Sequence, residues 1–273
     1  MKSKKVFDDK LIGYVYFLLD YNPRLSNKRG FVTKLISNLH ETTIGFAGFK
    51  SKKYLKQYLQ FQIFDDKEYK KLPKYNFGKK KILKIIKETL SKCHNKLPAR
   101  PTRTFLFPSF NSFVKNKMGG VGGFSPWRNT IIISINPTVR NWETALKKTI
   151  AHEYNHSVIY NSHKWENLLD SIIFEGFAEH FREQVVGGKR APWAKAVSQK
   201  ECQKYFSKLK EKLNSKNHQL YREVFFGSEK YPLWLGYSLG YQIVNSFLSK
   251  NKEKSWTDLV KIKPKEILKE SSF

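Results

Sequence analysis

The hydrophobic and polar positions of the chain follow two periods, and the shorter one predicts β-strands. Apolar and polar positions alternate from Tyr14 to Leu19, inside an apolar run that begins at Leu11. The β-branched run Ile131–Ile135 is bounded by turn-forming residues, and Thr104–Phe107 has a similar strand character. Such patterns are typical of strands that turn one face toward a core. The chain therefore contains at least three candidate strands.

The longer period, close to 3.6 residues, predicts helices. A single apolar stripe runs along the segment 79–95, formed by Ile82, Leu83, Ile85, Ile86 and Leu90. Asn141 is placed to cap a helix over 141–160, in which Leu146 and Ile150 keep a four-residue spacing. Other helical patterns cover 31–39, 52–61, 168–179 and 235–247. Residues 192–220 predict a basic amphipathic helix that would lie as a lid over a cleft.

A break in these patterns predicts the main division of the chain. The sequence Leu97-Pro98-Ala99-Arg100-Pro101 ends the helix 79–95, because proline cannot continue a helix and restricts the residue before it. We expect an N-terminal α/β region over residues 1–97 that packs on a second domain over residues 98–273. The N-terminal region either folds by itself or serves only to cover the sheet of the second domain.

The second of these domains contains the motif His152-Glu153-Tyr154-Asn155-His156. Residues four apart lie on one face of a helix, about 6 Å along its axis, so both imidazoles can reach one metal ion. Glu153 is rotated by about 100° from His152, so it borders such an ion without having to bind it. This HExxH pattern predicts a metal site with a catalytic base beside it.

A third ligand is predicted on the following helix. Glu175 follows the motif after eighteen intervening residues, and Glu179 lies one turn further on the same face. Gly176 lowers helix propensity, which indicates that two helix backbones approach each other closely at this point. The surrounding stretch, residues 149–184, holds six acids against two bases, although the chain as a whole is basic. An acidic patch of this kind favours a bound cation.

Two imidazoles and one carboxylate leave the fourth position of a tetrahedral zinc open for water, as in catalytic zinc sites. Zinc is inferred from the ligand types, and manganese or cobalt suits the same ligands. The metzincin pattern is excluded, because Ile159 and Ser162 stand where it needs glycine and histidine. His163 would lie about 10 Å from His156 along a continued helix, too far to share an ion. A structural thiolate site is excluded because the chain has no CxxC pair.

The motif and its spacing resemble the gluzincin metallopeptidases, whose aminopeptidases share HExxH, eighteen residues and then glutamate. A closer resemblance, over roughly residues 96–273, is to a bacterial family described as predicted zinc-dependent proteases of unknown function. The segments that carry it are HEYNH (152–156), LLD (168–170), EGFAE (175–179) and GYSLGY (236–241). The resemblance implies an α+β, zincin-like fold with a small mixed β-sheet over the HExxH helix and a second ligand-bearing helix. It also implies a helical C-terminal part.

The gluzincin resemblance assigns a role to each matching residue. His152 and His156 would be the imidazole ligands of Zn²⁺, and Glu175 would be its carboxylate ligand. Glu153 would be the general base that takes a proton from a metal-activated water and passes it to the leaving amine. Glu179 matches an acid that orients the first histidine, with a solvated helix acid as the alternative. The expected function is therefore that of a zinc metallopeptidase hydrolysing peptide or protein substrates.

A peptidase of this kind also needs a donor for the tetrahedral oxyanion, besides the metal. Tyr237 is the predicted donor and Tyr241 is the second candidate, four residues further along the helix 235–247. The alternative is that both tyrosines are core or interface aromatics. Gly236 and Gly240 are also four residues apart, which predicts close packing of this helix against another one.

A glycine-rich segment precedes the Ile131–Ile135 strand. In zincins the strand that lines the cleft binds an extended peptide through its backbone, and Gly119–Phe124 is placed to be that edge. Gly122, Gly123 and Phe124 are the expected substrate-binding residues, because glycine permits close backbone approach. A flexible hairpin tip is the alternative. A phosphate loop is excluded, because neither a Lys-Ser/Thr pair nor a helix follows.

Composition adds a second class of function. The formal net charge is +28 and the pI is about 9.9, which is compatible with nucleic acid as a partner. The lysines are spread along the chain without a known nucleic-acid motif, so coding bias or solubility is the favoured explanation. The alternative function is that of a basic nucleic-acid-associated protein whose metal site is structural or degenerate.

Two further features bear on the expected location. The two cysteines, Cys93 and Cys202, provide no disulfide framework and suit a reducing compartment. The apolar run Leu11–Leu19 is shorter than the roughly 20 residues of a membrane span, and the N-terminus lacks the features of a signal peptide. We expect a cytoplasmic protein without a membrane span. The sequence does not distinguish endopeptidase from exopeptidase action, nor does it name the substrate.

Overall fold

The structure is a computed structural model of the 273-residue chain. It describes residues 3–17 and 76–273, together with the isolated positions 19, 32, 53, 56, 57 and 60. The helical stretches expected over 31–39 and 52–61 therefore lie outside the described ranges. The chain forms two compact units; within the described ranges, the first unit ends at Ser157 and the second begins at Val158.

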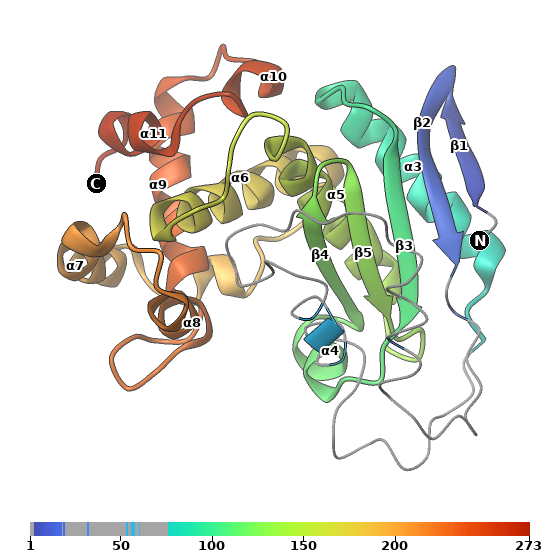
Figure 1. Ribbon diagram of the computed structural model, residues 1–273, viewed down its shortest axis with the longest axis horizontal. Helices are drawn as coiled ribbons and strands as arrows, with labels where there is room; N and C mark the ends of the chain where they lie inside the picture. Colours follow the sequence, from blue (N-terminus) through green and yellow to red (C-terminus); the bar gives the residue numbers. More distant parts are fainter. Residues whose placement is uncertain are drawn as a thin grey trace. The chain divides into compact units, whose positions relative to one another are not determined.

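The described strands of the first unit form one mixed, five-stranded sheet in the order β1-β2-β3-β5-β4 (Figure 1). The strands β2, β3 and β5 run parallel, whereas β1 and β4 are antiparallel to their neighbours. The three strands expected from the sequence are confirmed, and strands from both sides of residue 97 pair in this sheet. The domain boundary at residue 97 stays a prediction. The strand bounds are β1 Lys4–Asp8, β2 Lys10–Phe17, β3 Thr102–Pro108, β4 Val121–Trp127 and β5 Thr130–Ile135.

The helix α3 (Lys79–Lys96) packs on β1 and β2 through the apolar stripe predicted from the sequence. Ile82, Ile86 and Leu90 of this stripe are fully buried. Gly13 of β2 permits the contact, because a Cβ atom there would lie 3.2 Å from Leu90 Cδ1 and 2.9 Å from the backbone oxygen of the next strand. The predicted helix is thus confirmed, and the apolar stripe is its buried face.

The helix α5 (Trp142–Ile159) carries the HExxH motif and is attached to its surroundings by side-chain hydrogen bonds. Ser125 Oγ, on β4, donates to the backbone carbonyl of Glu153 at 2.7 Å. The Tyr154 hydroxyl donates to the carbonyl of Leu97, just after α3, also at 2.7 Å. These two bonds fix the middle of α5 against β4 and against the end of α3.

Asparagines begin both α5 and the short helix α4 (Ser112–Lys117). The Asn111 side chain accepts from the Val114 N–H and caps α4. Asn141 directly precedes α5, at the position expected from the sequence, and has a left-handed backbone with φ 63°. Asparagine tolerates this region better than most residues.

The second unit is helical, and its centre is the crossing of α6 with α9. The first turn of α6 is closed by a capping box, in which the side chains of Asn167 and Asp170 each accept from the other's backbone N–H. The helix bounds are α6 Leu168–Val186, α7 Gln199–Leu209, α8 His218–Phe226, α9 Leu235–Lys250, α10 Trp256–Leu259 and α11 Pro264–Glu270. A sheet in one unit and helices in the other confirm the α+β class.

Glycines allow α6 and α9 to cross in backbone contact. A Cβ atom on Gly176 would lie 2.2 Å from the Gly240 carbonyl oxygen, and one on Gly240 would lie 2.0 Å from the Ile172 carbonyl oxygen. Gly236 instead makes room for the ring of Phe225 in α8, which would lie 2.7 Å from a Cβ atom. The close helix packing predicted from Gly176, Gly236 and Gly240 is confirmed.

The prediction of a single helix over residues 192–220 is wrong. This segment contains the 3-10 turns η1 (Trp193–Lys195) and η2 (Lys210–Lys212), separated by α7. Ser198 begins α7 with a capping box, and Asn217 caps α8 by accepting from two backbone N–H groups. Local side-chain hydrogen bonds at these positions compete with helix continuation. The lid role stays a prediction.

Candidate metal centre

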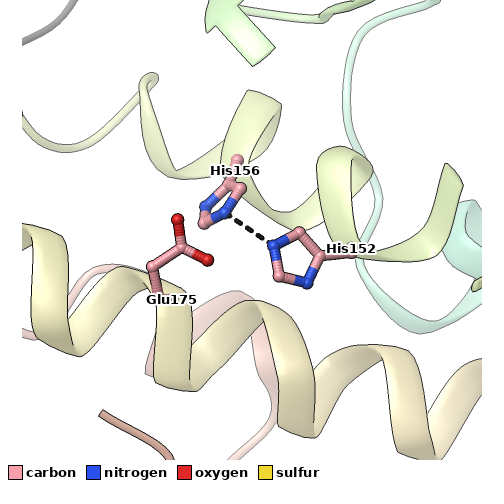
Figure 2. Close-up of side chains that lie close together, drawn as sticks. All are labelled: His152, His156 and Glu175. Atoms are coloured by element: carbon pink, nitrogen blue, oxygen red, sulfur yellow. Dashed lines mark hydrogen bonds between the residues drawn. The ribbon is translucent and has the colours of Figure 1, made fainter. Parts of the chain in front are cut away.

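The two histidines of the HExxH motif point to the same side of α5 (Figure 2). The Nε2 atoms of His152 and His156 are 3.0 Å apart, and the two rings are nearly perpendicular. This distance suits one hydrogen bond when one nitrogen carries the proton. It is also close to the roughly 3.3 Å between two nitrogens bound to a tetrahedral zinc at bond lengths of about 2.0–2.1 Å. The four-residue spacing therefore gives two imidazoles that can bind one ion.

Glu175 of α6 supplies a carboxylate to the same place, and Figure 2 shows this group turned toward the two rings. One ligand atom from each of His152, His156 and Glu175 lies within 4.8 Å of the other two. His156 is 4% exposed and Glu175 is 9% exposed. A buried carboxylate needs a positive or hydrogen-bonding partner. Among the residues that the structure describes, these three form the one group of His, Cys, Asp or Glu side chains with metal-binding geometry. Two imidazoles and a carboxylate are a donor set that fits zinc.

Glu153, the expected general base, is 7% exposed and contacts the strand β4. A Cβ atom built on Gly123 would lie 2.6 Å from Glu153 Cγ and 2.8 Å from its Oε1. The Glu153 side chain therefore fills the space that a side chain at position 123 would take. Lack of space for a side chain is therefore a sufficient reason for glycine at position 123.

The strand β4 lies at one end of the described sheet, and pairs with β5 through Gly122, Gly123 and Phe124. These residues lie within a regular strand, so the hairpin-tip alternative is wrong for them. Both Gly123 and Phe124 are partly exposed, and Gly122 is buried. The structure thus places the expected substrate-binding residues on a terminal strand that contacts Glu153, the expected general base. Their binding role stays a prediction.

Glu179 and Arg182 form a buried ion pair on α6, and each is 1% exposed. Glu179 Oε2 accepts from Arg182 Nη2 at 2.6 Å, and its Oε1 accepts from Trp193 Nε1 at 2.9 Å. The guanidinium also donates to the carbonyls of Gly187 and Lys189. The Glu179 carboxylate is therefore fixed one turn beyond Glu175. Its expected role of orienting a histidine stays a prediction.

Sequence reasoning did not identify Arg182 or Trp193 as parts of the site. Arg182 is one of two bases in the acidic stretch 149–184, and that isolated charge is the signal that could have identified it. Trp193 is fourteen residues from Glu179, and no periodic pattern connects the two.

The two tyrosines proposed as oxyanion donors have different surroundings. The Tyr241 hydroxyl donates to Glu183 at 2.9 Å, and its ring lies between His180 and the guanidinium of Arg190. Burial, followed by the hydrogen bond to Glu183, raises the pKa of Tyr241. The Tyr237 ring is partly exposed and makes a T-shaped contact with the Phe225 ring. Because its proton is donated to Glu183, Tyr241 is the less suitable donor.

A third tyrosine, Tyr221 of α8, was not singled out from the sequence. Burial is the main cause that raises its pKa, and the nearby Glu175 carboxylate raises it further. Its ring stacks on Phe225, with 4.6 Å between ring centroids. This hydroxyl stays protonated and lies near the candidate carboxylate ligand. The four-residue spacing from Tyr221 to Phe225 indicates one face of a helix, but it does not indicate which element packs against that face.

The fold and the site define a class: an α+β protein in which two histidines of an HExxH helix and a glutamate of a second helix converge. The profile of the family described as predicted Zn-dependent protease (DUF2268) matches residues 82–269. The chain belongs to this family.

Two curated relatives come from Bacillus subtilis (strain 168). The uncharacterized protein YjfC is 26% identical over 148 residues, which cover 49% of this chain and 47% of the relative. The uncharacterized protein YjaZ is 28% identical over 110 residues, which cover 38% of this chain and 42% of the relative. The chain therefore spans about half the length of the curated relatives it matches. No solved structure matches it significantly. Among its described residues, no helix is long and apolar enough to span a bilayer.

Proposed function

We propose that the protein is a zinc-dependent peptidase of the gluzincin type with a zincin-like fold. The observation that carries this proposal is the convergence of ligand atoms from His152, His156 and Glu175 within 4.8 Å. Membership of a family described as predicted Zn-dependent proteases supports the same conclusion. The mixed sheet and the two ligand-bearing helices agree with a zincin-like arrangement.

The residues divide the chemistry among them. His152, His156 and Glu175 would hold the ion. Bound there, zinc would polarise the scissile carbonyl and lower the pKa of a water molecule toward neutrality. Glu153 takes the proton from the attacking water and passes it to the leaving amine, so that the amine departs neutral. The 7% exposure of Glu153 keeps bulk water from competing for this proton.

Peptides or proteins are the proposed substrates, because the terminal strand β4 offers backbone groups to an extended chain. Gly122, Gly123 and Phe124 would form this edge. Tyr237 is the proposed oxyanion donor, and Tyr221 joins it as a candidate because of its position near Glu175. Nucleic acid as a partner rests on the net charge alone and stays a prediction.

The test is a comparison of the wild type with Glu153→Gln, which keeps the shape of the side chain and removes its basicity. We expect about one zinc per chain in both proteins, and a fall in kcat of roughly 10²–10⁴-fold in the variant. Zinc is measured by elemental analysis, and hydrolysis with a peptide library in the presence and absence of a chelator. The single variants Tyr237→Phe and Tyr221→Phe, compared in the same assay, show which of the two hydroxyl groups contributes to kcat.

Glu143→Gln is the matched control, because it makes the same substitution in the first turn of α5, where Glu143 pairs with Lys81. We expect this variant to keep both zinc and activity. A wild-type protein that binds no zinc, or a Glu153→Gln variant with full activity, would contradict the proposal. Hydrolysis that resists the chelator would contradict it as well.

A further inference from the structure

Gly123 has an unusual reason for being glycine. The backbone of Gly123 does not have a positive φ, so a residue with a side chain could adopt the same conformation. Space is the constraint: a Cβ atom there would lie 2.4 Å from Thr149 Cγ2, 2.6 Å from Glu153 Cγ and 2.8 Å from Glu153 Oε1. All three contacts are side-chain atoms of α5. The absence of a side chain at position 123 therefore leaves the volume in which the Glu153 carboxylate lies.

The strand and the helix cannot simply separate to make room for an added atom. Gly123 pairs with Ile133 of β5 within the sheet, and two residues later Ser125 Oγ donates to the Glu153 carbonyl at 2.7 Å. Tyr154 also bonds α5 to the carbonyl of Leu97 at 2.7 Å. Movement of α5 away from β4 would lengthen the bond from Ser125, so an added methyl group is expected to displace side chains.

The two crowded side chains differ in how readily they move. Thr149 is β-branched, and its χ1 angle is restricted in a helix. Glu153 ends in a carboxylate beyond three rotatable bonds, and the atom nearest its free end, Oε1, is among those that a Cβ atom would meet. The carboxylate is therefore the group that shifts most when position 123 gains a side chain.

We propose that Gly123 is a positioning residue for the general base: the bare strand backbone at this point leaves the space in which the Glu153 carboxylate lies, and a side chain there would displace it. This inference rests on the proposed function, in which Glu153 is the base. It assigns Gly123 a role beyond substrate binding. The edge expected to pair with the peptide would then also position the group that activates the water.

The test is Gly123→Ala in the full chain. A displacement of about 1 Å in a catalytic group can cost roughly 10²-fold in rate, so we expect kcat to fall by about 10- to 100-fold. KM should stay within about threefold, and zinc content should remain about one per chain. A raised KM with unchanged kcat would assign Gly123 to substrate binding alone and overturn the proposal.

Two further variants separate positioning from general damage. Ser125→Ala lies on the same strand and loses a contact with the backbone of Glu153, not with its carboxylate, so its kcat should stay within about twofold of the wild type. Gly123→Ala/Thr149→Ser removes the Cγ2 atom that would be most crowded. It should recover stability while kcat stays low, and it replaces the single variant if that one does not fold. Full recovery of kcat in the double variant would overturn the proposal.

Crystal structures of the wild type and of Gly123→Ala provide a measurement that needs no activity. The Glu153 carboxylate should move by about 1 Å or more while the two imidazoles keep their positions, and an unmoved carboxylate in the folded variant would overturn the proposal. If the wild type hydrolyses no peptide, the proposed function fails, yet the structures still decide whether Gly123 positions Glu153.

Discussion

The two helices that carry the candidate ligands are held in place by different means. The middle of α5 is attached by single hydrogen bonds, from Ser125 to the Glu153 carbonyl and from Tyr154 to the carbonyl of Leu97. The helix α6 touches α9 backbone to backbone at Gly176, and a buried ion pair lies further along it. The middle of α5 is thus held by side-chain hydrogen bonds, whereas α6 is held by contact between helix backbones and by a buried ion pair.

This difference indicates how stability is divided between the two helices. A neutral hydrogen bond contributes about 1 kcal/mol net, whereas breaking a buried ion pair or inserting atoms between packed backbones costs several times more. We therefore expect the loss of one hydrogen bond of α5 to cost little stability. Changes around α6 should affect the fold first.

The strongest test of this division is Gly240→Ala on α9. The new Cβ atom would lie 2.0 Å from the Ile172 carbonyl oxygen, and the helix backbones would have to separate. We expect a loss of at least about 3 kcal/mol in the free energy of unfolding, because overpacking of this kind falls at the upper end of its range. Urea denaturation followed by circular dichroism measures it.

Gly187→Ala is the control, because it adds the same methyl group just after α6, where no atom lies within 4 Å of the new Cβ. Gly187 has φ 67° and ψ −160°, a conformation that is essentially restricted to glycine, so alanine should cost about 1–3 kcal/mol through backbone strain alone. Equal losses in the two variants would show that the crossing of α6 and α9 is not the rigid part of the molecule.

The glycines of this crossing show what the sequence can reveal. The low helix propensity of Gly176 and the spacing of Gly236 and Gly240 predicted close helix contacts, because a helix keeps glycine only for a reason. The partner of each glycine was not predictable, since it depends on tertiary packing. Gly123 shows the same limit: its residue type suggested close approach of a substrate, and its contact with Glu153 appears only in three dimensions.

The candidate ligands were the most predictable part of the site. Helix periodicity alone brings His152 and His156 together, and one further helix is enough to add Glu175. Arg182, Trp193 and Tyr221 depend on contacts between separate elements, so their surroundings could not be read from the sequence. The prediction of one helix over 192–220 is wrong for a local reason. The basic amphipathic pattern continues across Ser198, although this residue caps α7 and begins a new helix.

A second test changes the ion pair of α6 by Arg182→Met. The variant leaves Glu179 buried without its guanidinium partner, and such a loss typically costs about 3–5 kcal/mol. Thermal and urea denaturation should show this destabilisation. A variant that unfolds at the wild-type midpoint would mean that the pair adds nothing to the rigidity of α6.

Two companions show whether charge or geometry is responsible. Arg182→Lys keeps the charge but loses the planar fork that reaches Glu179, Gly187 and Lys189 together, so it should recover only part of the loss. Glu179→Gln/Arg182→Met removes both charges and should be less destabilised than the sum of the single variants. Additive losses in this cycle would show that the two side chains do not interact energetically.

The smallest effect is expected on the other helix, from Tyr154→Phe. The substitution removes only the hydroxyl that donates to the Leu97 carbonyl at 2.7 Å, and the ring, 1% exposed, keeps its packing. We expect a loss of about 1 kcal/mol in unfolding free energy, with zinc content and kcat within about twofold of the wild type. Denaturation, elemental analysis and a peptide assay measure the three quantities. A tenfold fall in kcat at this modest cost in stability would contradict the prediction, because it would mean that α5 transmits small movements to Glu153.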